Sequence, residues 1–263
     1  MKLQPVEIKE FVLDNNKKKL AVNITTLFLL AILGGLFVAF GAYGSTVASY
    51  SIESISIKKI LSGAVFPVGL ILIIIGGGEL FTGNTLLLLS YIDKRKGMVA
   101  PILNNWIIVY LGNLIGSLFL VTLIINSDLL NQDLLNAFVA MAQVKVELTF
   151  SQAFIRGILC NILVVMAVWM SYSAKDTISK IFAIWFPIMV FVVSGFEHSI
   201  ANMFFIPMGI FLADITWSGF LFNNLVPVTL GNIVGALIIC LIYYRLGLNN
   251  KIIETKKPEN IAN

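Results

Sequence analysis

Long apolar stretches separated by short polar connections make up most of this chain. A helix needs about 18 apolar residues or more to cross a bilayer. Six regions meet that requirement: 22–48, 60–92, 99–126, 151–172, 178–213 and 222–246. The second and fifth are too long for one simple helix, and each contains a polar interruption. The pattern predicts an all-α integral membrane protein with six crossings, two of them broken.

Polar segments flank and join these regions. Residues 4–19 predict an amphipathic helix lying at the inner membrane interface, with a pore lid as the alternative. Residues 126–149 form the longest polar connection. We expect an N-terminal helix at 1–20, a transmembrane channel domain at 21–247, with repeats at about 21–126 and 150–247, and a cytoplasmic tail at 248–263.

Composition agrees with this class and narrows it. Hydrophobic residues make up 58% of the chain and charged residues 12%, with a mean hydropathy of +0.93, well outside the range of soluble domains. Membrane lipid is the expected surrounding. The formal charge of +4 gives no reason to expect nucleic-acid binding. Only two cysteines occur, both within apolar regions, so we expect neither a disulfide framework nor a metal cluster.

The distribution of basic residues predicts the orientation. With both termini inside, fourteen of the eighteen Lys and Arg residues lie on the inner side, and the outer four are Lys58, Lys59, Lys145 and Arg156. Inner loops of membrane proteins carry such an excess. The charged start of the chain lacks the features of a cleaved secretory signal. We therefore expect a multi-pass protein of the plasma membrane with both termini in the cytoplasm.

Both interruptions place polar residues at membrane depth. The first, 76–85, begins with three glycines, which destabilise a continuous helix; the second, 195–202, contains His198, the only histidine of the chain. In hydrocarbon, an unwound backbone must find partners within the protein or in a water-filled cavity. Ionisable residues at this depth usually serve a pathway or a pair. The two breaks therefore mark the candidate site.

The two halves of the chain resemble each other. The pattern G-x-E-x-x-x-x-N begins at Gly77 and again at Gly195, at an offset of 118, and L-G-N-[LI]-[IV]-G-[SA]-L begins at Leu111 and Leu230, at an offset of 119. Three crossings per repeat require the halves to have opposite orientation. Inverted repeats with a broken helix in each half are a recurring plan of transport proteins, with the site between the breaks. One pore per chain follows.

Several residues near the breaks are candidates for the site. His198 can donate or accept a proton near neutral pH, and Thr82 offers a hydroxyl from the opposite break. We expect Glu79 and Glu197 to stabilise the loops by accepting from freed backbone N–H groups. Asn84, Asn161 and Asn202 either donate to an anion or tie the loops together, and Lys145 is either part of a cationic funnel for anions or an ordinary loop lysine. The apolar residues that flank the breaks form either pore constrictions or ordinary packing: Phe66, Leu70, Leu80, Phe81 and Phe191.

The same stretches resemble a known family. Residues 74–83 (IIGGGELFTG) are similar to the first signature of the formate/nitrite transporter family, and the G-x-x-C-N stretch at 157–161 resembles its second. Residues 194–204 (SGFEHSIANMF) match the family's histidine loop. Val165 and Met166 depart from the usual residues of the second signature.

The resemblance implies an aquaporin-like bundle that assembles as a homopentamer, with a pore for formate, nitrite or hydrosulfide in each protomer. It makes His198 the pore histidine, with Thr82 facing it, and Lys145 the lysine of the outer vestibule. It assigns Phe66, Leu70, Leu80 and Phe191 to constrictions, and Asn161 and Asn202 to the pore. The overall character is most similar to the hydrosulfide branch.

Other functional classes fit the sequence less well. An aquaporin-type channel for neutral solutes normally carries Asn-Pro-Ala at both half-helix starts, and the chain contains no such tripeptide. One histidine excludes bis-histidine haem ligation within the chain, and we expect no enzymatic activity and no cofactor. A proton-coupled transporter stays an alternative to a channel, since inverted repeats serve both.

Overall fold

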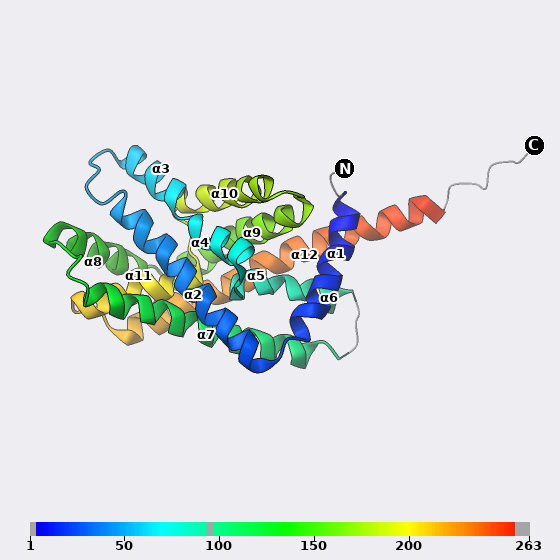
Figure 1. The fold of residues 1–263 in the computed structure, drawn as a ribbon, viewed down its shortest axis with the longest axis horizontal. Coiled ribbons are helices and arrows are strands. Elements are labelled where there is room, and N and C mark those ends of the chain that lie inside the picture. Colours follow the sequence, from blue (N-terminus) through cyan, green and yellow to red (C-terminus); the bar gives the residue numbers. More distant parts are fainter. Residues whose placement is uncertain (1–3, 94–96, 256–263) are drawn as a thin grey trace, which may run out of the picture.

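The computed structural model describes residues 4–93 and 97–255, with residues 247–255 described by their backbone alone. Helices make up the regular structure of these residues, packed side by side along one long axis, and α1 lies across the end where α12 emerges (Figure 1). The α-helices are α1 Pro5–Leu20, α2 Ile24–Val47, α3 Ile55–Val65, α4 Val68–Ile71, α5 Phe81–Asn84, α6 Leu88–Ile92, α7 Val99–Ile125, α8 Gln132–Val146, α9 Phe150–Ser173, α10 Thr177–Val193, α11 Ser199–Leu212 and α12 Val226–Thr255. Leu72–Gly77 and Gly219–Leu225 form π-helical turns, and Thr85–Leu87 a 3₁₀ turn.

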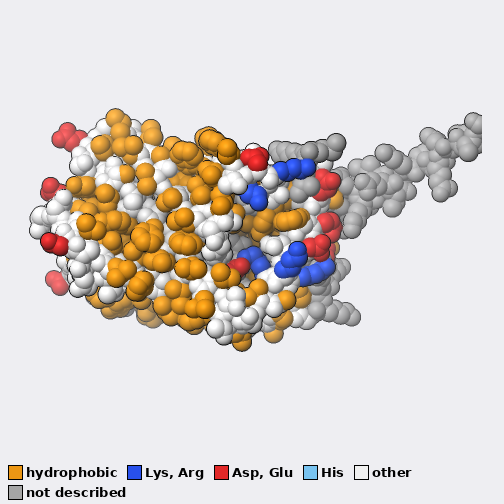
Figure 2. Space-filling model, in the orientation of Figure 1, with side chains coloured by type: hydrophobic (Ala, Val, Ile, Leu, Met, Phe, Trp, Pro, Cys, Tyr) orange, Lys and Arg blue, Asp and Glu red, His pale blue; other side chains and the backbone are white. Residues whose placement is uncertain are grey.

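Among the described residues, five helical segments are long and apolar enough to cross a membrane: Ile24–Val47, Ile55–Gly77, Val99–Ile125, Phe150–Ser173 and Gly219–Leu246. They overlap five of the six expected regions; in the second, 60–92, a shorter apolar segment, Phe81–Ile92, follows the break. The sixth, 178–213, consists of two shorter apolar helices, α10 and α11. Hydrophobic side chains cover the middle of the molecule and charged ones gather at its two ends (Figure 2), as a bilayer requires.

Both expected breaks are present, and a glycine turns the chain at each. Gly77 (φ +93°) ends the π-helical turn before α5, and Gly195 (φ +71°) follows α10 before α11. A left-handed backbone of this kind favours glycine because it has no Cβ. The extended residues that follow place the starts of α5 and α11 inside the bundle, where Thr82 and His198 are buried.

Two elements differ from the expectation drawn from sequence. The connection at 126–149 contains a helix, α8, whose Leu134, Phe138 and Ala142 are buried. These buried residues recur at every fourth position, on one face of the helix, and that face packs against α11. At the other end, α12 continues to Thr255, past the expected end of the span at 247. The rest of the expected tail, 256–263, lies outside the described residues.

The bundle is held together by two closely packed helix pairs, α2 with α7 and α9 with α12. An added Cβ at Gly35 would lie 2.0 Å from the carbonyl oxygen of Asn113, and one at Gly231 would lie 2.2 Å from that of Phe154. Small residues let helix backbones approach this closely in lipid. These pairs carry the two L-G-N motifs, so the motifs serve packing as well as the site.

Replacement of either contact glycine by alanine is expected to lower stability by about 1–3 kcal/mol, because the helices must separate to admit a methyl group. Gly44→Ala is the matched control, since its Cβ would meet only a side-chain carbon of Val65 at 3.4 Å. Thermal unfolding of G35A, G231A and G44A in one detergent tests this. Equal melting temperatures for all three would contradict it.

Candidate functional site

The two breaks meet at one hydrogen bond. Thr82 Oγ1 in α5 lies 2.8 Å from Nε2 of His198, the residue that caps α11. The side chains are 0% and 4% exposed. The sequence predicted that these two residues face each other from opposite halves, and the structure brings them together.

The backbone around His198 fixes the proton on its ring. Nδ1 accepts from the backbone N–H of Ala201 at 3.0 Å, so Nδ1 carries no hydrogen in this arrangement. A neutral imidazole has one donor and one acceptor nitrogen. The ring hydrogen therefore resides on Nε2, which donates to Thr82 Oγ1. The Thr82 hydroxyl keeps its own hydrogen for another acceptor.

Apolar side chains surround the ring. Phe191 stacks on His198 with centroids 5.8 Å apart, and Phe66 meets Phe191 edge-on at 5.4 Å. Leu70 and Leu80 are buried in the same apolar core. Phe81 points elsewhere, because its ring packs edge-on against Trp106 and Tyr110 of α7. Its expected place in a constriction stays a prediction, and none of its ring contacts joins it to His198 in the way that Phe191 is joined.

On one side of this group, Glu79 forms a buried ion pair. Both carboxylate oxygens accept from Lys19 Nζ at 2.6 Å, and one also accepts from Asn84 Nδ2 at 2.7 Å. Lys19 comes from the end of α1 and also donates to Asn84 Oδ1 at 3.0 Å. The amphipathic helix therefore brings a cation to the first break.

On the other side, Glu197 makes the equivalent contacts. Its carboxylate accepts from Lys145 Nζ at 2.9 and 3.1 Å and from Asn202 Nδ2 at 2.6 Å. Lys145 comes from α8, so each break is paired with a lysine from a separate amphipathic helix. Of these two lysines, the sequence analysis named only Lys145 as a candidate site residue. The lysine cluster that ends the expected interfacial helix was the one feature of the sequence that pointed to Lys19.

The two breaks are stabilised chiefly by Asn113 and Asn232, the asparagines of the two L-G-N motifs. The sequence analysis gave these asparagines no role. Asn113 Oδ1 accepts from Phe81 N at 3.0 Å, and its Nδ2 donates to the carbonyls of Ala31 and Glu79 at 2.7 and 2.8 Å. The Asn113 amide thus takes the role that was expected for the glutamate carboxylates, whose hydrogen bonds come from side chains instead.

Asn232 repeats this arrangement in the second half. Its Oδ1 accepts from Ser199 N at 3.0 Å, and its Nδ2 donates to the carbonyls of Gly157 and Glu197 at 2.8 and 3.1 Å. Asparagine suits this place because one amide both accepts from a helix start and donates to freed carbonyls.

Polar atoms near the breaks are left for a solute. Asn161 Nδ2 donates to Thr85 Oγ1 at 3.1 Å and to the Asn232 carbonyl at 2.7 Å. Within the described residues, Asn161 Oδ1, Asn202 Oδ1 and Ser199 Oγ are buried without a hydrogen-bond partner. Buried polar groups almost always have partners, so these oxygens have unused capacity for hydrogen bonds. Among side chains that the structure describes, no three His, Cys, Asp or Glu gather to hold a metal ion.

The sequence profile of formate/nitrite transporters matches residues 6–246. The chain belongs to the formate/nitrite transporter family. It is 42% identical to a probable formate transporter of Methanothermobacter thermautotrophicus, over 83% of this chain and 88% of the relative. It is 36% identical to a formate channel of Bacillus thuringiensis, over 88% of this chain and 90% of that one.

Solved structures of the family share the fold. A pentameric formate channel with formate bound superposes with a TM-score of 0.77 at 36% identity, covering 85% of this chain and 96% of its own. An ion channel of the same family superposes with a TM-score of 0.82 at 26% identity, covering 91% and 98%. The protein is therefore a membrane channel or transporter for small monovalent anions, not an enzyme.

Loss of the Asn232 amide is expected to destabilise the second break by about 3 kcal/mol or more, since three backbone groups lose their partner at about 1 kcal/mol or more each. The measurement is the free energy of unfolding of Asn232→Ala in detergent. Asn223→Ala is the control, because that exposed side chain makes one long bond of 3.3 Å to the Val146 carbonyl. An equal loss in both variants would rule out the assigned role.

Proposed function

We propose that the chain forms a homopentameric channel of the plasma membrane that conducts formate through one pore in each protomer. The observation that carries the proposal is the hydrogen bond between Thr82 and His198, which joins the two breaks at 2.8 Å inside the apolar core. Formate is favoured over nitrite and hydrosulfide because the two relatives and the pentameric structure described above are named for it. None of the relatives and structures described above is named for hydrosulfide, the anion of the branch that the overall character of the sequence favoured.

Because its surroundings are apolar, the site must lower the cost of bringing an anion into the bundle. Moving a bare carboxylate into a medium of low dielectric is very costly unless its charge is compensated. Lys19 and Lys145 lie beside the two breaks and attract the anion, although each is shared with a glutamate. Phe66, Leu70, Leu80 and Phe191 then line the constrictions, in this proposal, and remove its water.

The hydrogen-bond directions define what His198 does. The neutral ring holds one proton, on Nε2, and giving it up completely would leave an imidazolate. The ring therefore shares this proton with formate in a hydrogen bond, with the Thr82 hydroxyl as second donor. Formic acid, formed when formate takes a proton from hydronium in the outer water, is better still: it is neutral, and its O–H can donate to the free oxygens of Asn161 and Asn202.

We further propose six crossings in two inverted repeats, each with one broken span, and both termini in the cytoplasm. The support is that residues 118 or 119 positions apart make equivalent contacts in the two halves. Glu79 corresponds to Glu197, Asn84 to Asn202, and Asn113 to Asn232. In the part of the chain with placed side chains, lysines lie mostly at the end that carries the termini (Figure 2). Residues 1–20, 21–247 and 248–263 keep their expected domain roles in this arrangement.

His198→Ala and Thr82→Val are each expected to lower formate uptake about tenfold or more, the value of one or two hydrogen bonds to a charged group. The measurement is the initial rate of uptake into liposomes at acidic and neutral pH. Thr122→Val is the matched control, because that exposed hydroxyl only donates to its own helix at Leu118. Wild-type rates for both pore variants would refute the proposed role, and proton movement during uptake would distinguish a coupled transporter.

Lys19→Met is expected to slow formate uptake about tenfold, because it leaves the Glu79 carboxylate buried without its cation, and this charge repels anions. Lys17→Met is the control, since Lys17 lies on the same helix in an exposed pair with Asp14. The double variant K19M/E79Q is expected to be less impaired than K19M, because no unpaired charge remains. Uptake equal to wild type in K19M would contradict a role for this pair.

A further inference from the structure

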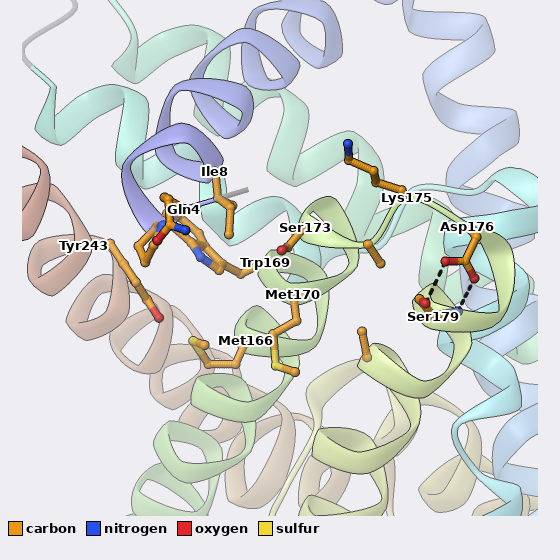
Figure 3. Close-up of a pocket in the computed structure, with 13 residues that line it drawn as sticks. Gln4, Ile8, Met166, Trp169, Met170, Ser173, Lys175, Asp176, Ser179 and Tyr243 are labelled. Atoms are coloured by element: carbon orange, nitrogen blue, oxygen red, sulfur yellow. Dashed lines mark hydrogen bonds between the residues drawn. The ribbon is translucent and has the colours of Figure 1, made fainter. Parts of the chain in front are cut away.

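A second cavity lies away from the pore, at the end of the bundle that carries the N-terminus (Figure 3). It measures about 740 Å³ and is lined by residues of α1, α9, α10 and α12. This volume lies within the range of about 300–1,000 Å³ that is typical of ligand sites. The pore mechanism uses none of its lining residues.

The cavity has an apolar floor and an aromatic wall. Met166 and Met170 of α9 line the floor, and Met170 is 41% exposed. Trp169 and Tyr243 stack with centroids 4.2 Å apart and form the wall. Tryptophan and tyrosine concentrate where the membrane meets water, which agrees with a cavity at the end of the bundle.

The rim carries one charge of each sign. Lys175 and Asp176 lie in the turn between α9 and α10, and no ion pair of Lys175 occurs among the described residues. Asp176 caps α10: its carboxylate accepts from the backbone N–H and the hydroxyl of Ser179, both at 2.8 Å. These hydrogen bonds, the backbone one foremost, lower the pKa of Asp176 below its ordinary value, which keeps the rim neutral overall at physiological pH.

One buried polar group faces the cavity without a partner. Ser173, the last residue of α9, is 7% exposed, and its hydroxyl has no hydrogen-bond partner among the residues described. Figure 3 shows the hydroxyl directed toward Ile8 and Trp169, inside the ring of lining residues. A buried hydroxyl costs free energy unless it is hydrogen-bonded, so this group points to a ligand with a polar atom at that depth.

We propose that this cavity binds one glycerophospholipid with a zwitterionic headgroup bearing a primary amine. Lys175 pairs with the phosphate, Asp176 accepts from the ammonium, and the Ser173 hydroxyl donates to the glycerol ester region. The acyl chains run over Met166 and Met170. An anionic headgroup matches the rim less well, because Asp176 opposes it; a quaternary amine has no N–H to donate to that carboxylate.

The lipid also touches the helix that brings Lys19 to the first break. Gln4, Pro5 and Ile8 at the start of α1 line the cavity, and Ile8 is buried. An occupied cavity therefore holds the start of α1 against α9 and α12. The proposal does not rest on the identity of the transported anion, since the two sites share no residue.

Native mass spectrometry of the full-length detergent-purified protein tests the proposal, with dioleoyl phosphatidylethanolamine, phosphatidylcholine and phosphatidylglycerol added separately. Wild type is expected to bind the ethanolamine lipid about two- to fivefold more tightly than the other two, as one partly exposed ion pair allows. Asp176→Asn keeps the helix cap and is expected to remove this preference. Lys175→Gln and Ser173→Ala are each expected to weaken all three lipids, because the phosphate and the glycerol esters are common to them.

Lys180→Gln is the control, because Lys180 lies on α10 outside the cavity, and its binding is expected to equal that of wild type. Equal binding of the three lipids, tighter binding of phosphatidylglycerol, or no response to Asp176→Asn would each overturn the proposal. Displacement of lipid by inorganic phosphate alone would show an ion site instead. A changed subunit number in Lys175→Gln with unchanged lipid binding would show a contact between copies.

Discussion

The structure depends on satisfying an unwound backbone in the middle of a membrane protein. Where α10 stops and α11 begins, and where the π-helical turn gives way to α5, N–H and C=O groups lose their helical partners in a place without bulk water. Asn113 and Asn232 each accept from an N–H at a helix start and donate to one carbonyl of the break and to one carbonyl of a packed helix, α2 or α9. The breaks can therefore persist, and the helix starts that carry Thr82 and His198 stay inside the bundle.

Charge at this depth is handled by the same principle of complete pairing. Each glutamate beside a break meets a lysine and an asparagine, so the protein brings in charge without leaving it uncompensated. The lysines come from α1 and α8, two amphipathic helices outside the helices of the breaks. Anion attraction is thereby linked to the seating of surface helices, and movement of either helix alters the charge at its break.

The surroundings of His198 and the cavity beside α1 differ in how their buried polar groups find hydrogen-bond partners. At His198, the backbone N–H of Ala201 dictates where the single ring proton resides, and in the proposed channel a passing solute completes the remaining hydrogen bonds. At the end that carries α1, the neutral rim formed by Lys175 and Asp176 surrounds an apolar floor, and the proposed lipid completes it. Rapid passage needs few and exchangeable contacts, whereas residence needs many.

The sequence by itself determined the class of protein, the places of the two breaks, the repeat and the family. These features are local: run length fixes a membrane span, glycine destabilises a helix where it stands, and a motif is recognised without its surroundings. Only the tertiary structure decided that Lys19 reaches Glu79, that Phe81 turns to Trp106, and that Lys145 of α8 reaches Glu197. Such contacts join residues far apart in the chain. Their formation depends on how helices rotate and pack, which spacing along the sequence does not specify.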